Sequence, residues 1–98
     1  MNKDLENFYH FLNSRKIEEA ELEILRLLSS HPDDFLLLNN YGTVLSLKND
    51  SLGAINQFKK VINIKSDFYQ AYYSLAHLYA KLSLFEESLE YLKKYLKH

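Results

Sequence analysis

The chain matches itself when it is shifted by 34 residues, with small residues falling on small residues and large apolar residues on large apolar ones. The matched sets are Ala20, Ala54 and Ser88; Ile24, Phe58 and Leu92; Leu27, Val61 and Tyr95; and the pairs Leu38 with Tyr72, Tyr41 with Leu75, Gly42 with Ala76 and Leu45 with Tyr79. A fixed period of this length indicates one supersecondary unit that is repeated, so that neighbouring units stack and bury a continuous core. The repeat predicts the kind of surface that the protein offers, but not what binds there.

Apolar residues recur every three or four positions within each unit, and leucine, glutamate and lysine are common, which favours helices over strands. Polar clusters divide the chain into six segments of helical length. Their approximate spans are 2–13, 16–30, 34–48, 51–64, 67–82 and 84–97. The sequence therefore predicts an all-α fold of three helical hairpins in a single domain, 1–98, with repeats at about 1–34, 35–68 and 69–98.

Local signals at the ends of these segments support the same division. The turn His31-Pro32-Asp33-Asp34 is expected to end one helix and begin the next, because proline disfavours a helical residue before it and the aspartates can cap the following helix. Ser66-Asp67 is expected to cap the fifth helix, and Ser83 with Glu86 has the spacing of a capping box for the sixth. These residues predict where three of the helices begin.

The middle unit contains Leu38, Tyr41-Gly42, Leu45, Ala54 and Phe58, and the third unit contains Tyr72, Leu75-Ala76, Tyr79, Ser88 and Leu92 at the same places. Together with the period and the helix pairing, these residues resemble the tetratricopeptide repeat, whose signature spans about 34 residues. The first unit is degenerate, because Asp4 and Asn7-Phe8 stand where the signature has a large residue and a Leu-Gly pair. The resemblance implies a right-handed superhelical array of three antiparallel helical hairpins, an α-solenoid without a capping helix after the last repeat.

Small residues recur where the two helices of each predicted hairpin would cross. Gly42, Ala54 and Ala76 are expected at these crossings, because closely packed helices leave no room there for a larger side chain. Large apolar residues, Phe58 among them, are expected to fill the volume around the crossings. We therefore expect the small residues to be buried.

In tetratricopeptide-repeat proteins the first helix of each unit lines a concave groove that binds peptides or partner helices. By this resemblance the groove is lined by Asn2, Leu5, Tyr9, Asn13, Leu36, Asn39, Thr43, Leu47, Gln70, Tyr73, His77 and Lys81. The candidate peptide-binding residues among them are Tyr9, Asn13, Asn39, Thr43, Gln70, Tyr73, His77 and Lys81. Amides and hydroxyls can bond a peptide backbone, and aromatic rings can cover apolar side chains. The groove thus predicts a protein or peptide partner with an uncharged or amphipathic segment.

Some members of the family bind the carboxylate tail of chaperone peptides with a clamp of lysines, asparagines and an arginine. At the corresponding positions this chain has Leu5, Tyr9, Asn40, Gln70 and Ser74. Only Asn40 matches, and the missing positive charges argue against a chaperone tail as the partner. The competing interpretation is a groove lined merely by residues that keep the surface soluble.

The C-terminal end is a second candidate surface, since such arrays usually finish with a polar-faced capping helix and no residues remain for one here. The seam meant for a next repeat is expected along Leu75, Leu78, Leu82, Tyr91 and Tyr95. An exposed apolar strip of this kind motivates the hypothesis that the chain self-associates as a homodimer or docks on a larger complex as a structural module. The alternatives are tolerated exposure and inward collapse of the last helix.

Composition narrows the classes of partner and compartment. The net charge is -1 and only Arg15 and Arg26 supply guanidinium groups, so no nucleic-acid partner is expected. No apolar run has the length of a signal peptide or of a transmembrane helix, so we expect a cytoplasmic protein with no membrane partner. The absence of cysteine removes disulfides, thiolate metal sites and thiol nucleophiles.

The histidines are His10, His31, His77 and His98. None has a second histidine or a carboxylate at the spacing of a known metal site. His77 shares a helical face with Tyr73 and Lys81, which an enzyme could use as a base, a proton partner and a cation. Because no nucleophile, phosphate-binding glycine loop or paired acid accompanies them, we expect a lining role, with no enzymatic activity, no cofactor and no metal.

Overall fold

The computed structural model describes the backbone of residues 2–97 and the side chains of residues 5–97. Six helices follow one another in it: α1 (Asn2–Asn13), α2 (Ile17–Ser30), α3 (Phe35–Leu47), α4 (Ser51–Ile64), α5 (Tyr69–Lys81) and α6 (Phe85–Leu96). Residues 2–97 contain no strand, and each helix lies within the segment predicted for it, so the all-α prediction is confirmed. The side chains of Asn2, Asp4 and His98 lie outside the described part.

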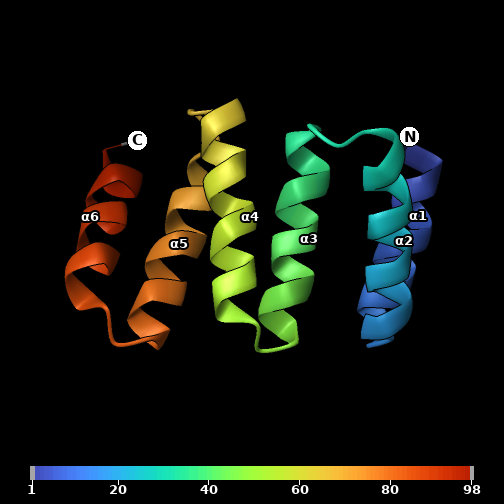
Figure 1. Cartoon of the computed structure of the whole chain (residues 1–98), viewed down its shortest axis with the longest axis horizontal. Helices are drawn as coiled ribbons and strands as arrows, with labels where there is room; N and C mark the ends of the chain where they lie inside the picture. The colour runs from blue at the N-terminus through green and yellow to red at the C-terminus, as the bar shows by residue number, and fades with distance from the viewer. Residues whose placement is uncertain (1, 98) are drawn as a thin grey trace.

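The helices pair into three hairpins, α1–α2, α3–α4 and α5–α6, which stand side by side along the longest dimension of the molecule (Figure 1). Neighbouring hairpins meet through α2 with α3 and through α4 with α5, so the order of the helices in the chain is also their order in space. The molecule measures 37 × 24 × 19 Å, with the first and third hairpins at its two ends. The fold is a helical-repeat solenoid.

The helices of the middle hairpin cross where Gly42 of α3 meets the ring of Phe58 of α4. A methyl group at Gly42 would lie 2.8 Å from Cζ of Phe58, well inside the optimum of about 3.5–4.0 Å between carbon atoms. Ala54 of α4 is fully buried, and in the third hairpin the Ser88 hydroxyl donates a hydrogen bond of 2.7 Å to the carbonyl oxygen of the buried Ala76. The expectation that small residues lie buried at the crossings is confirmed.

The core runs through the stack as two clusters that share neighbours. The first is built from α1, α2 and α3 around Phe8, and the second from α3, α4 and α5 around Phe58 and Leu75. Leu28 and Tyr41 pack against both clusters, which makes the core continuous from the first hairpin to the third. Apolar burial, the dominant favourable term in folding, therefore holds the hairpins together.

The turn inside each hairpin repeats one backbone geometry. Arg15, Asn49 and Ser83 have positive φ angles of 61°, 65° and 62°. In each turn the amide of the next residue donates to the carbonyl oxygen five residues before it, at 2.8 or 2.9 Å, which is the Schellman pattern that ends a helix. Ser83 thus closes α5, and α6 begins after Leu84 without a side-chain cap, so the capping-box prediction for α6 is wrong.

Between hairpins, the predicted aspartate cap is present at α3 but not at α5. Oδ1 of Asp34 accepts hydrogen bonds of 3.0 and 3.2 Å from two amides in the first turn of α3. Helix α5 begins after Phe68, which has no side-chain cap, so the prediction that Ser66-Asp67 caps it is wrong. Phe68 is placed instead by packing, since its ring contacts the Phe35 ring edge-on with centroids 5.3 Å apart.

The Asp34 cap should contribute measurably to stability. In Asp34→Ala both first-turn amides lose this acceptor, so the free energy of unfolding should fall by about 1 kcal/mol, measured by urea titration followed by circular dichroism. Asp33→Ala, one residue earlier and exposed, is the control and should change by less than about 0.5 kcal/mol. Asp34→Asn keeps the acceptor and should stay near wild type. Equal losses in the two alanine variants would contradict the capping role.

Candidate functional site

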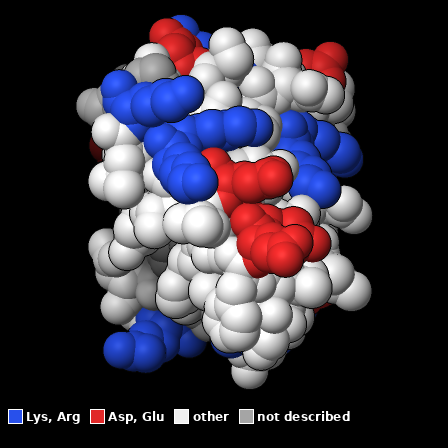
Figure 2. All heavy atoms as spheres, turned by 90° about the vertical axis from the view of Figure 1, so that its left-hand side faces the viewer, with Lys and Arg blue, Asp and Glu red and all other residues white. Residues whose placement is uncertain are grey.

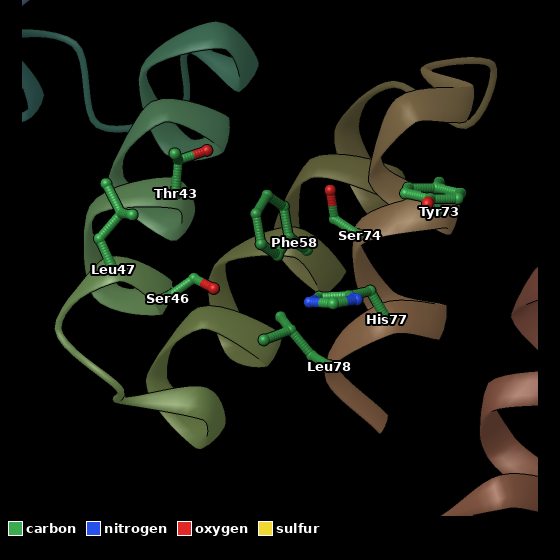
Figure 3. A pocket seen from close by; sticks show the side chains of 8 residues that line it. All are labelled: Thr43, Ser46, Leu47, Phe58, Tyr73, Ser74, His77 and Leu78. Carbon is green, nitrogen blue, oxygen red and sulfur yellow. The ribbon is translucent and has the colours of Figure 1, made fainter. Parts of the chain in front are cut away.

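A cavity of about 190 Å³ opens between α3 and α5, above the point where α4 passes beneath them (Figure 3). Its lining residues are Thr43, Ser46 and Leu47 of α3, Phe58 of α4, and Tyr73, Ser74, His77 and Leu78 of α5. The first helices of two successive hairpins thus form its walls, and the second helix of the middle hairpin supplies its floor.

The cavity combines an apolar floor with a polar rim. Phe58 and Leu78 are buried at its base, and the Phe58 ring lies between the two walls in Figure 3. The His77 imidazole extends from α5 toward α3, and the Ser46 side chain reaches from α3 toward the same space. Such a site can cover one apolar side chain while its hydroxyl and imidazole groups bond polar atoms around it.

Of the eight predicted peptide-binding residues, the structure brings Thr43, Tyr73 and His77 to the cavity. The others do not line it: Tyr9 and Asn13 are exposed on α1, Asn39 is half-buried on α3, and Gln70 and Lys81 are exposed on α5. Oδ1 of Asn39 is buried without a hydrogen-bond partner, and the Thr43 hydroxyl donates to the Asn39 carbonyl oxygen at 3.2 Å. The cavity occupies only part of the predicted groove.

Two residues singled out from the sequence are engaged with neighbouring elements. Nδ2 of Asn40 donates to the Tyr9 hydroxyl at 3.2 Å and links α3 to α1. Nζ of Lys81 donates to Oδ1 of Asn49 at 2.9 Å and links α5 to the turn between α3 and α4. The one match to the carboxylate clamp and the one lysine of the predicted groove are therefore both used within the molecule.

Four cavity residues were not predicted to line the groove: Phe58, Ser46, Ser74 and Leu78. Phe58 belongs to a second helix, which was expected to serve only the core, and it reaches the groove because Gly42 has no side chain to block its ring. Ser46 lies one turn after Thr43 on α3, so the helical period alone could have included it.

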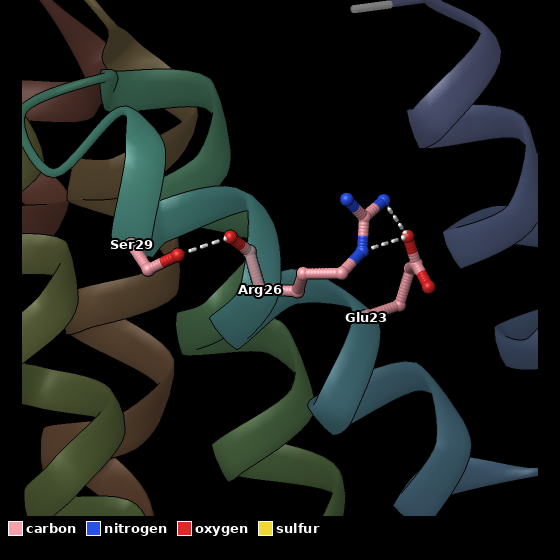
Figure 4. A network of polar contacts seen from close by, with 3 residues as sticks. All are labelled: Glu23, Arg26 and Ser29. Carbon is pink, nitrogen blue, oxygen red and sulfur yellow. Dashed lines mark hydrogen bonds and ion pairs between the residues drawn. The ribbon is translucent and has the colours of Figure 1, made fainter.

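Acidic residues of α2 are paired within the molecule. Nε and Nη2 of Arg26 both donate to Oε1 of Glu23, the former at 3.1 Å, and the Ser29 hydroxyl donates to the Arg26 carbonyl oxygen at 2.7 Å (Figure 4). Nζ of Lys48 lies 2.6 Å from Oε1 of Glu21, and this hydrogen bond is the largest cause that raises the pKa of Lys48. These charges tie α2 to itself and to the end of α3.

The structure corrects part of the predicted C-terminal seam. Leu75 and Leu78 are only 0% and 1% exposed, so their assignment to an exposed seam is wrong. Helix α5 packs against α4 of the preceding hairpin. Leu75 and Leu78 therefore lie in the core that the two hairpins share, and not on a face left for a next repeat. Leu82 is exposed, whereas Tyr91 and Tyr95 are half-buried.

Tyrosine rings attach α6 to α5. Tyr91 stacks on Tyr79 with centroids 5.6 Å apart and an interplanar angle of 4°, and Tyr95 contacts Tyr73 at 5.2 Å. Burial raises the pKa of the Tyr91 phenol, and the nearby Lys59 of α4 opposes that shift. Helix α6 itself contains no buried residue, so half-buried side chains, these rings among them, and the Ser88 hydrogen bond attach it to α5.

Among residues 5–97, no group of three His, Cys, Asp or Glu side chains is placed to hold a metal ion. Over the part of the chain that the structure describes, no helix is both long and apolar enough to cross a bilayer. Both neighbours of His77 on its helical face make other contacts: Lys81 bonds Asn49, and the Tyr73 ring contacts Tyr95.

A family model described as "Tetratricopeptide repeat" matches residues 69–97, which contain the third hairpin. No curated protein matches the chain by sequence. The structure is similar to the TPR domain of P58(IPK), with a TM-score of 0.90 and 27% identity over 98% of this chain and 27% of that one. It is also similar to the TPR2B domain of yeast Sti1 in its complex with pHsp70, with a TM-score of 0.89 and 17% identity over 96% of this chain and 75% of that one.

The structure is similar as well to that of MamA, with a TM-score of 0.88 and 23% identity over 92% of this chain and 53% of that one. This chain spans about half the length of MamA, 49% in one of its structures. At these identities the likeness concerns the fold, and it extends over all three hairpins. The repeat signature is thus matched in the third hairpin, and the whole stack shares its fold with solved tetratricopeptide-repeat structures.

Proposed function

We propose that this chain is a non-catalytic protein-interaction module that binds an apolar or amphipathic segment of a partner protein between α3 and α5. The observation that supports this most directly is the cavity over Phe58, with its apolar floor and its rim of hydroxyl and imidazole groups. Its volume of about 190 Å³ is below the ~300–1,000 Å³ typical of sites for small-molecule ligands. A single anchoring side chain of a bound segment is the better match in size.

The charge of the cavity supports an uncharged segment. Its eight described lining residues include no aspartate, glutamate, lysine or arginine. A charged anchor side chain that entered this cavity would lose its hydration without meeting an opposite charge, which is energetically costly. An apolar anchor would lose nothing of this kind, while the flanking backbone could bond Thr43, Ser46 and Ser74.

The comparison with Sti1 supports the same class of function. Its TPR2B domain has this fold and forms a complex with pHsp70, so a stack of such hairpins can hold a partner protein. Because the identity is only 17%, the comparison does not indicate the partner of this chain. We infer the chemistry of the partner from the residues of this groove instead. We place the module in the cytoplasm as part of the same proposal, on the absence of long apolar runs from the sequence.

A library of random peptides displayed on phage, selected on this chain, tests the proposal. Enriched peptides should share an apolar or aromatic anchor, and Ser46→Phe, which fills the cavity from its rim, should weaken their binding. Burial of a large apolar side chain contributes about 1.5–3 kcal/mol, so the dissociation constant should rise about 10- to 150-fold in fluorescence polarisation with labelled peptides.

Asn56→Phe is the matched control, because it adds the same ring to an exposed position of α4. Its affinity for the enriched peptides should equal that of the wild type, and circular dichroism should show the same helix content in both variants. Peptides that bind Ser46→Phe as tightly as wild type would contradict the proposed site. Enrichment of acidic peptides without an apolar anchor would contradict the proposed ligand.

A further inference from the structure

One face of α6 is apolar and uncovered. Phe85, Leu89 and Leu96 are 67%, 51% and 70% exposed, and Leu92 between them is half-buried. Their spacing of four, three and four residues aligns the four side chains in one stripe along the helix. None of the helices within residues 2–97 covers this stripe.

The preceding repeat shows what such a stripe is shaped for. Leu89 corresponds to Ile55 of α4 in the repeat register, and Ile55 is only 5% exposed. Ile55 lies in the same core cluster as Leu75 of α5, the helix that the next hairpin lays against α4. The stripe on α6 therefore has the form of a surface that receives another helix.

Each residue of the stripe is followed directly in the sequence by a charged residue. These charged residues form a row beside the stripe: Glu86, Glu90, Lys93 and Lys97. All four side chains are exposed, and none forms an ion pair with another described residue. Figure 2 looks onto this end of the molecule and shows basic side chains gathered above acidic ones. The helix is thus acidic in its first turn and basic in its last turn.

We propose that the α6 stripe pairs with the same stripe of a second copy, with the two helices antiparallel about a two-fold axis. Reversal of direction brings Phe85 of one copy against Leu96 of the other and Leu89 against Leu92, so the apolar rows coincide. It also sets the acidic half of each charged row against the basic half of the other. A parallel pairing about a two-fold axis would set each charged row against the other flank of the partner helix, so this charge complementarity would be lost.

The size of the surface predicts a dimer of moderate affinity. A helix of 12 residues is about 18 Å long at 1.5 Å per residue. It covers less than the roughly 800 Å² per partner of a standard stable interface, even with the exposed Leu82 and Leu84 beside it. We therefore expect a dissociation constant in the micromolar range.

Sedimentation equilibrium of the intact chain tests the pairing. The wild type should pass from monomer to dimer across the micromolar range, and Leu89→Glu should raise the dissociation constant at least about 100-fold, since two copies of the charge enter one interface. Leu22→Glu is the matched control, because Leu22 is 70% exposed on α2 at the other end of the stack. A wild type that stays monomeric at millimolar concentration, or equal effects of the two variants, would overturn the proposal.

Charge reversal tests whether a second copy of the chain is what binds the α6 stripe. Glu86→Lys with Glu90→Lys makes the row wholly basic, and Lys93→Glu with Lys97→Glu makes it wholly acidic. Each variant alone should dimerise at least about 10-fold more weakly than wild type, and an equimolar mixture should regain a dimer that contains one of each. A mixture that associates no better than its components would overturn the charge complementarity.

The orientation can be read from single cysteines, since the chain has none of its own. In the antiparallel pair Glu90→Cys lies near the two-fold axis and should cross-link to its counterpart on oxidation. Two copies of Glu86→Cys would lie about 13 Å apart along the helices and should not. Efficient cross-linking of Glu86→Cys alone would overturn the antiparallel arrangement. All of these variants leave the α3–α5 cavity unchanged, so this result and the peptide-binding result are scored separately.

Discussion

Phe58→Ala is expected to lower the free energy of unfolding by about 3–5 kcal/mol, the range for truncation of a buried phenylalanine. Phe58 is 2% exposed, and its ring fills the crossing of the middle hairpin against Gly42. Small domains have only about 5–15 kcal/mol of stability in total, so this loss is a large part of it. Urea unfolding followed by circular dichroism should show a much lower midpoint with an unchanged slope.

Two further variants connect this loss to the crossing itself. Lys60→Ala, exposed on the same helix, should change stability by less than about 0.5 kcal/mol. Gly42→Ala should destabilise the wild type, because the added methyl group meets the Phe58 ring at 2.8 Å. In the Phe58→Ala background the same change should stabilise by up to about 1 kcal/mol, since the space is free and alanine favours helix. An identical effect of Gly42→Ala in both backgrounds would contradict the contact.

Ala54→Leu should cost about 1–3 kcal/mol by overpacking. Ala54 is fully buried on α4, at the place that Ala20 occupies in α2 and Ser88 in α6. A leucine there must push α3 and α4 apart or adopt a strained rotamer, because the interior is already close-packed. Thermal and urea unfolding of the variant should both show the loss.

Asn56→Leu is the control for Ala54→Leu, because it adds leucine to the same helix at an exposed position. It should change stability by less than about 0.5 kcal/mol. An Ala54→Leu variant as stable as wild type would mean that the crossing has spare room. Small residues would then not set the distance between the two helices.

Local features of the chain could be predicted from its sequence. The helices lie within their predicted segments, because apolar spacing and turn residues act over a few positions. The Asp34 cap also follows from its immediate neighbours. The caps predicted from Ser66-Asp67 and Ser83 failed because other interactions decide those turns: packing of Phe68 in the first and a Schellman turn at Ser83 in the second.

The candidate site could be predicted only in outline. The first-helix rule located Thr43, Tyr73 and His77, which face the cavity. It could not show that Phe58 forms the floor, because that depends on how closely α4 approaches α3 at Gly42. Nor could it show that Lys81 bonds a turn of the middle hairpin, since the two residues are 32 positions apart in the chain.

The sequence by itself determined a stack of three helical hairpins, because a period of 34 residues repeats both the helical spacing and the small residues that let helices cross. Only the tertiary structure decided which apolar faces are covered. Leu75 is inside and Leu89 is outside, although both are leucines in helical register. The periodicity of one helix shows that it has an apolar face, whereas burial depends on which neighbouring hairpin packs against that face.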